Sequence, residues 1–220
     1  MSRRLRIDVL FDFICPWCLI GKRQLEHALV QFRSRHPDVQ ITTAWHGVQL
    51  LPQIPVEGEP FADFYRKRLG NADAMTMRQA QVQQAAAAVG LAIDLSRIET
   101  MPNTADAHRL FARAAQTGNA SQREMLLERL FSAYFLRREN LGCRETLLAI
   151  ARSCGVYSDE LLDCLIGDAT PFEGHPGATS GVPSFQFDGR MTVIGAQPAQ
   201  ALLGAMNEAL KESERERQPA

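Results

Sequence analysis

The chain has 220 residues, of which 45% are hydrophobic, and this is enough for a substantial buried core. Its 24 Lys and Arg residues nearly balance its 25 Asp and Glu residues, so no strong long-range field favours nucleic acid or an anionic membrane. Asp8 and Asp12 interrupt the first apolar run, which argues against a secretory signal. No stretch approaches the roughly 18 apolar residues that cross a bilayer. We therefore expect a cytoplasmic protein that binds neither nucleic acid nor membranes.

The first third of the chain predicts a β-α-β unit. Arg6 to Ile14 is rich in β-branched and aromatic residues and predicts a strand buried on both faces. Residues 19–32 carry an apolar stripe at helical spacing, and residues 39–45 predict a second strand. A crossover helix between two strands implies that the strands are parallel.

The middle of the chain, residues 61–166, shows helical patterns almost exclusively, after an irregular connection over residues 46–60. Ser121 and Glu124 match a capping box and predict the start of one amphipathic helix, with apolar positions at 126, 127, 130, 131, 134 and 135. The other predicted helices lie at 61–69, 75–89, 103–116, 143–153 and 158–166.

The last forty residues return to a β pattern and then a helix. Asp188-Gly189, between VPSFQF and RMTVIG, is a strong hairpin signal, and residues 198–211 predict a final helix. The simplest architecture is an α/β domain, residues 1–60 and 167–220. A helical domain, residues 61–166, is inserted between its β-α-β and β-β-α halves.

The motif Cys-Pro-Trp-Cys at residues 15–18 lies where the first strand gives way to the helix. Cys15 would sit at the helix N-terminus, where backbone N-H groups and the helix dipole favour a thiolate. Cys18 would lie one turn further along the same face, within reach for a disulfide. Pro16 suits the first turn because it gives up an N-H that would lack a partner. This predicts Cys15 as nucleophile and Cys18 as resolving thiol.

Two other interpretations of the cysteine pair remain open, namely half of a zinc site and a purely structural pair. Five cysteines at irregular positions argue against a secreted disulfide framework and leave metal binding or redox catalysis for the close pair. No second C-x-x-C and no H-x-x-H is present to complete a zinc site, so we expect no metal. Cys143, Cys154 and Cys164 most resemble small buried hydrophobic residues.

Three separated segments together resemble one known family. They are FDFICPWCLIGKRQLE at 11–26, NTADAHRL at 103–110 and GVPSFQFDGRMTVIGAQP at 181–198. Their order and spacing resemble the DsbA family of thioredoxin-fold oxidoreductases, which carries a helical insertion. The match is closest to its FrnE-like branch, whose relatives include 2-hydroxychromene-2-carboxylate isomerases and kappa-class glutathione transferases.

This resemblance implies that Pro183 is a cis-proline facing the cysteine pair. The backbone of Val182 would then pair with an extended substrate beside Cys15. From the residues alone, an ordinary trans proline at the start of a strand is the alternative.

The resemblance also implies further substrate contacts. Asn103 and His108 match a helix that the family places over the active site, although a packed helix residue is the simpler interpretation of His108. Pro16 and Trp17, between the cysteines, are further candidate substrate contacts. Trp17 would lie at the surface, and the alternative for it is a packing aromatic.

The leading functional hypothesis is a thiol-disulfide oxidoreductase that acts on a disulfide or dithiol in a protein, peptide or small molecule. The alternative is a glutathione-dependent isomerase or transferase. The resemblance implies that relatives of this kind usually carry a single serine or lone thiol at the position of Cys15. A non-catalytic binding module is a third hypothesis. We expect no resident cofactor, with glutathione as a candidate co-substrate. The oligomeric state stays open, a homodimer included.

Overall fold

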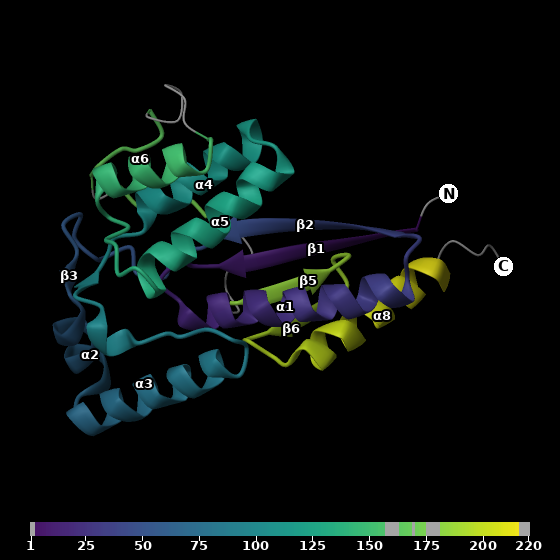
Figure 1. Ribbon diagram of the computed structural model, residues 1–220, viewed down its shortest axis with the longest axis horizontal. Coiled ribbons are helices and arrows are strands. Elements are labelled where there is room, and N and C mark those ends of the chain that lie inside the picture. The colour runs from purple at the N-terminus through teal and green to yellow at the C-terminus, as the bar shows by residue number, and fades with distance from the viewer. Residues whose placement is uncertain (1–2, 157–162, 169, 175–180, 216–220) are drawn as a thin grey trace. The chain divides into compact units, whose positions relative to one another are not determined.

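The computed structural model describes residues 3–156, 163–168, 170–174 and 181–215 (Figure 1). The chain divides into two compact units. Unit 1 comprises Met1–Phe11, Trp17–Gly47 and His175–Ala220, and unit 2 comprises Asp12–Pro16 and Val48–Gly174. Unit 2 therefore takes in residues 48–60 and 167–174, which the sequence assigned to the α/β domain.

Unit 1 is built on a four-stranded sheet in the order β2-β1-β5-β6. β1 (Arg3–Phe11) and β2 (Val39–Gly47) are parallel and are joined by the crossover helix α1 (Pro16–Arg35). β5 (Ser184–Phe187) runs antiparallel to β1, and β6 (Met191–Ile194) runs antiparallel to β5. The predicted β-α-β unit and the predicted hairpin are both confirmed.

The hairpin turn has the backbone that its sequence predicts. Asp188 and Gly189 both take positive φ, 49° and 71°, which is the combination that type I′ turns require. Asp188 also joins the turn to β1, because its Oδ1 accepts a hydrogen bond of 2.7 Å from the Arg6 N-H.

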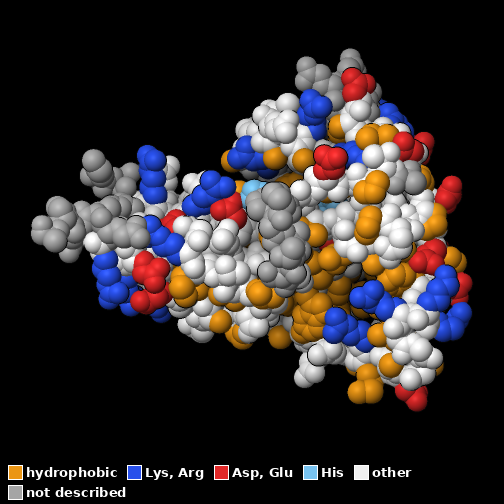
Figure 2. All heavy atoms as spheres, turned by 180° about the vertical axis from the view of Figure 1, so that it is seen from behind, with side chains coloured by type: hydrophobic (Ala, Val, Ile, Leu, Met, Phe, Trp, Pro, Cys, Tyr) orange, Lys and Arg blue, Asp and Glu red, His pale blue; other side chains and the backbone are white. Residues whose placement is uncertain are grey.

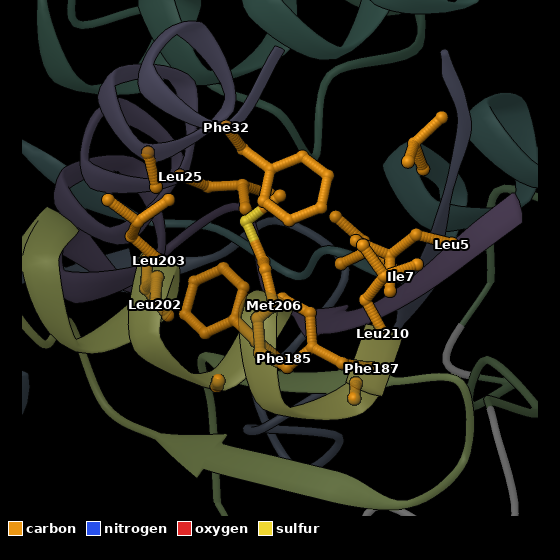
Figure 3. Packing of buried hydrophobic residues seen from close by; sticks show 14 of the residues in the cluster. Leu5, Ile7, Leu25, Phe32, Phe185, Phe187, Leu202, Leu203, Met206 and Leu210 are labelled. Atoms are coloured by element: carbon orange, nitrogen blue, oxygen red, sulfur yellow. The ribbon is translucent and has the colours of Figure 1, made fainter. Parts of the chain in front are cut away.

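The hydrophobic core of unit 1 lies between the sheet and two helices, α1 and α8 (Ala199–Arg215) (Figure 3). Alternate residues of β1 point into it, together with the two phenylalanines of β5. Because both helices contribute to this one cluster, both cover the same face of the sheet. The core includes Leu5, Ile7, Val9, Leu25, Phe32, Phe185, Phe187, Leu202, Leu203, Met206 and Leu210.

The prediction that the first strand is buried on both faces is wrong. Leu5, Ile7 and Val9 are buried, whereas the alternate residues Arg4 and Arg6 are exposed and Asp8 is half-buried. Because α1 and α8 cover one face, the side chains of alternate residues point away from that core. The sequence suggested a doubly buried strand because most residues from Ile7 to Ile14 are apolar, so inward-facing and outward-facing positions look alike.

Unit 2 is mainly helical, which confirms the predicted insertion between the two halves of the sheet. Within its described residues, the strands β3 (Glu59–Pro60) and β4 (Thr100–Met101) pair over two residues each, and the sequence did not predict them. The helices are α2 (Phe61–Leu69), α3 (Ala72–Ala87), the 3-10 helix η1 (Leu95–Arg97), α4 (Ala105–Thr117), α5 (Ala120–Phe135) and α6 (Arg144–Ser153).

The predicted capping box at Ser121 and Glu124 is wrong by two residues. Asn119 is the N-cap of α5: its side chain accepts from the Gln122 N-H at 2.9 Å, and Gln122 Oε1 accepts from the Asn119 N-H at 3.1 Å. Asn caps a helix as well as Ser does, and Gln can replace Glu in the box, so both pairs fitted the pattern. The six predicted apolar positions of this helix are all buried.

The helix predicted at 158–166 lies mostly outside the described residues; the described residues 163–166 form a turn and irregular backbone. In the part of the chain that the structure describes, no helix is both long and apolar enough to cross a membrane.

A polar cluster occupies the face of the sheet in unit 1 that points away from α1 and α8. Asp8 accepts from Arg6 Nε at 2.7 Å and lies 2.7 Å from His46 Nε2. Burial by itself would raise the pKa of Asp8, but the hydrogen bonds from Arg6 and His46 outweigh it and hold the pKa below its ordinary value.

We expect the Asp8→Asn variant to lose about 1 kcal/mol of unfolding free energy near pH 7 and less near pH 3. A carboxyl whose folded-state pKa is lowered stabilises above its unfolded pKa of about 4, and this contribution disappears as the pH falls. Urea unfolding at the two pH values measures the difference. Asp63→Asn, which removes an exposed pair with Arg66, is the control. An equal loss at both pH values would contradict the prediction.

Two helical glycines of unit 1 differ in the space around them. A Cβ on Gly21 of α1 would lie 3.0 Å from Phe185 Cζ and 3.1 Å from Pro183 Cγ, whereas a Cβ on Gly204 of α8 would meet nothing within 4 Å. Close approach of α1 to β5 therefore depends on Gly21.

We expect Gly21→Ala to destabilise the protein by about 1 kcal/mol, because overpacking outweighs the gain in helix propensity. Gly204→Ala is the matched control and should stabilise by up to about 1 kcal/mol. Thermal or urea unfolding of both variants tests the pair, and two changes of the same sign would contradict it.

Candidate active site

The cysteine motif lies at the junction that the sequence predicts. β1 ends at Phe11, and the Cys15 N-H closes a turn by donating to the Asp12 carbonyl at 3.1 Å. α1 then begins at Pro16, so Cys15 directly precedes the helix and Cys18 lies in its first turn. The first turn of α1 contains no acidic residue that would oppose a thiolate.

Both cysteines of the motif are present as thiols. Cys15 is 8% exposed, whereas Cys18 is fully buried. The division between the two units falls between Pro16 and Trp17, so Cys15 belongs to unit 2 and Cys18 to unit 1. Pro16 is buried and Trp17 is half-buried, so the aromatic ring is less exposed than the sequence led us to expect.

The Val182–Pro183 peptide bond is cis, which confirms the sequence prediction for this bond. Pro183 is buried at the start of β5 and lies beside Gly21 of α1, three residues beyond Cys18. Val182 is half-buried. Their contact with substrate stays a prediction.

In unit 2, the Asp12 carboxylate is fully buried and forms hydrogen bonds with three segments of the chain. Oδ2 accepts from the Leu50 N-H at 2.8 Å. Oδ1 accepts from the Ile14 N-H at 3.3 Å and lies 3.1 Å from His108 Nε2. Toward an ionised carboxylate, which only accepts hydrogen bonds, Nε2 of His108 would be the nitrogen that donates.

His108 lies on α4 with its side chain fully buried. Its ring stacks on Phe172, at 5.1 Å between ring centroids, and packs at a tilt of 33° against Phe13, at 4.9 Å. Asn103, just before α4, is buried as well. Its amide nitrogen donates to the Ile54 carbonyl at 2.7 Å, and its amide oxygen accepts from Gln49 at 3.0 Å.

The structure therefore brings His108 into contact with the turn that carries Cys15, through Asp12. It gives both Asn103 and His108 contacts within unit 2 itself, and a direct contact of either with substrate stays a prediction. Asp12 was missed as a site residue. Its position three residues before Cys15, as a charge in an apolar run, was the available signal.

Tyr65 of α2 is a second residue that the sequence did not indicate. Its phenol is half-buried and packs against Phe61, at 4.6 Å between ring centroids. Burial raises the pKa of Tyr65; Arg78 opposes this rise, and negative charge on Cys15 adds to it. Tyr65 and Cys15 are thus close enough to interact electrostatically within unit 2.

Basic side chains surround this part of unit 2. Figure 2 shows Lys and Arg side chains beside hydrophobic ones around α2 and α3. Arg68 lies over the Phe64 ring at 6.0 Å. Charge on both Arg68 and Arg78 lowers the pKa of Tyr65. Among the described residues, no group of three or more His, Cys, Asp and Glu side chains is arranged to hold a metal ion.

The electrostatic link between Tyr65 and Cys15 can be measured. We expect the Tyr65 phenol to titrate above the ordinary value of about 10 and to titrate earlier in the Cys15→Ser variant, because that variant lacks the thiolate that raises its pKa. The phenolate absorbance of each protein, minus that of its Tyr65→Phe counterpart, isolates this titration. An unchanged midpoint in Cys15→Ser would contradict the link.

Several solved structures are similar to this chain over nearly its whole length. A probable DsbA oxidoreductase from Streptomyces coelicolor superposes with a TM-score of 0.80 at 26% identity, covering 98% of this chain and 92% of that chain. A 2-hydroxychromene-2-carboxylate isomerase (TM-score 0.59, 14% identity, 97% and 100% covered) shares the fold. So does the cytosolic disulfide reductase DsbM from Pseudomonas aeruginosa, solved with glutathione (TM-score 0.55, 16% identity, 96% and 98% covered).

The sequence comparison agrees with the architecture. The family model of the DSBA-like thioredoxin domain matches residues 6–172, which include most of β1, the cysteine motif, β2 and most of unit 2. The chain therefore belongs to the DSBA-like thioredoxin domain family.

Proposed function

We propose that this protein is a thiol-disulfide oxidoreductase in which Cys15 is the nucleophile and Cys18 the resolving thiol. The observation that carries the proposal is the position of the motif: Cys15 directly precedes α1 and Cys18 lies in its first turn. The N-H groups at the start of a helix favour an anion, so a thiolate is best supported at Cys15. The substrate class is a disulfide or dithiol in a protein, peptide or small molecule.

The reaction proceeds in two exchange steps. The Cys15 thiolate attacks one sulfur of the substrate disulfide, forming a mixed disulfide and releasing the other substrate sulfur as a thiolate that takes up a proton. The Cys18 thiol then loses its proton, and the resulting thiolate attacks the Cys15 sulfur of the mixed disulfide. The second substrate sulfur leaves as a thiolate and takes up a proton. Two electrons pass to the substrate, and the protein is left with a Cys15–Cys18 disulfide. The reverse sequence oxidises a dithiol.

The different exposures of the two sulfurs support these roles. The 8% exposed Cys15 is the one that a substrate can approach, whereas the buried Cys18 suits an internal attack on the mixed disulfide. Pro16 and Trp17 between them, and Val182 and Pro183 before β5, are the proposed substrate contacts.

Glutathione is the proposed co-substrate that recycles the cysteine pair, and the proposed location is the cytoplasm. DsbM, which shares the fold, is a cytosolic disulfide reductase solved with glutathione. The five irregularly placed cysteines also suit a reducing compartment.

The second candidate is a glutathione-dependent isomerase or transferase, favoured by the fold shared with 2-hydroxychromene-2-carboxylate isomerase. In that case Cys15 would activate or replace the thiol of glutathione, and Cys18 would be dispensable. The presence of two cysteines favours the redox proposal.

Turnover of insulin or glutathione disulfide by wild type and variants tests the assignment. We expect Cys15→Ser to fall to the uncatalysed background, because no sulfur remains to form the mixed disulfide. Cys18→Ser should accumulate a stable mixed disulfide at Cys15, visible by intact-protein mass spectrometry.

Cys143→Ser is the matched control, since Cys143 precedes α6 and donates to Glu145 away from the motif. It should retain wild-type turnover. Full turnover by Cys15→Ser would overturn the assigned roles. Glutathione-dependent isomerisation or transfer that survives in Cys18→Ser would favour the second candidate.

A further inference from the structure

The buried Asp12–His108 pair has no part in the two exchange steps, yet it contacts the turn that carries Cys15. Asp12 accepts two hydrogen bonds from this turn. Its backbone carbonyl accepts from the Cys15 N-H at 3.1 Å, and its carboxylate accepts from the Ile14 N-H at 3.3 Å. All of these groups belong to unit 2. Any change in the orientation of Asp12 is therefore transmitted to the backbone at Cys15.

Two groups outside the turn set the orientation of the Asp12 side chain. The bond from Ile14 is long for an N-H donor, whereas the Leu50 N-H donates at 2.8 Å and His108 Nε2 lies at 3.1 Å. Ring contacts with Phe13 and Phe172 hold the imidazole in place, and α4 supplies its backbone. The pair is thus anchored on a helix distant in sequence from the cysteine motif.

We propose that His108 is a positioning residue for Cys15: its imidazole holds the Asp12 carboxylate, and Asp12 holds the turn that presents the Cys15 sulfur. This inference rests on the proposed function, because it takes Cys15, the group that the arrangement positions, as the nucleophile. Removing the imidazole leaves a buried carboxylate with a donor missing, and such a group reorients toward any other donor or water within reach.

The test compares two variants at one position. His108→Leu fills a similar volume without a donor, whereas His108→Gln retains an N-H at a similar distance along the side chain. The rate of Cys15 alkylation by iodoacetamide in the reduced full-length protein is followed by peptide mass spectrometry. Cys143 in the same samples is the internal control.

We expect His108→Leu to slow alkylation of Cys15 by about tenfold or more, because small displacements of a reacting group cost large factors in rate. His108→Gln should retain most of the wild-type rate, and Cys143 should react equally in all three proteins. If His108 only stabilised the fold, the variants would change the unfolding midpoint, and His108→Gln would not restore the rate of Cys15 alkylation. Equal Cys15 rates in His108→Leu and wild type, or equally slow rates in His108→Leu and His108→Gln, would overturn the proposal.

Asp12→Asn, alone and combined with His108→Leu, tests the route through Asp12. If His108 acts through this carboxylate, His108→Leu should slow Cys15 little further in the Asp12→Asn background. Independent, multiplying effects would refute that route. If His108→Leu does not fold, His108→Asn replaces it, since its amide is one methylene shorter than that of Gln and does not reach Asp12 in the same way.

Alkylation reports how Cys15 is presented, whether or not the protein turns over disulfides. A wild type without disulfide turnover would therefore refute the proposed function, while the comparison of His108→Leu with His108→Gln would still decide the role of His108.

Discussion

Burial of the Asp12 carboxylate is the constraint on which the site in unit 2 depends. A buried charge is tolerated only where hydrogen-bond donors surround it, and the turn after β1 supplies one donor, the Ile14 N-H. The others come from Leu50 and His108, which lie 38 and 96 residues away along the chain. The hydrogen bonds to this one carboxylate thus bring three segments together at the turn that leads into α1.

The neighbouring aromatic and amide groups make this arrangement specific. Phe13, two residues before Cys15, packs on His108, Phe111 and Phe131, so the turn is held by α4 and α5 as well as by its own hydrogen bonds. Asn103 joins the start of α4 to Gln49 and Ile54. Polar networks of this kind impose one geometry when all of their members are satisfied.

Unit 1 contributes rigidity of a different kind. β1 and α1 are consecutive elements packed over one apolar core, so hydrophobic packing sets their positions relative to each other. Gly21 lets α1 approach Pro183 and Phe185 closely. Cys18, on α1, is therefore held within unit 1 by packing, whereas the turn that carries Cys15 is held within unit 2 by hydrogen bonds.

The sequence by itself determined the elements whose signals are local. Hydrophobic periodicity, Asp188-Gly189 and the cysteine spacing predicted the strands, the hairpin, the long helices and the place of Cys15 and Cys18, because each depends on neighbours within a turn or a strand. Which face of β1 is buried, and where Asp12, Tyr65 and His108 lie, follow only from the tertiary structure. Those outcomes depend on contacts between residues far apart in sequence, and the burial that gives a carboxylate or a phenol its role exists only once the distant helices have packed around it.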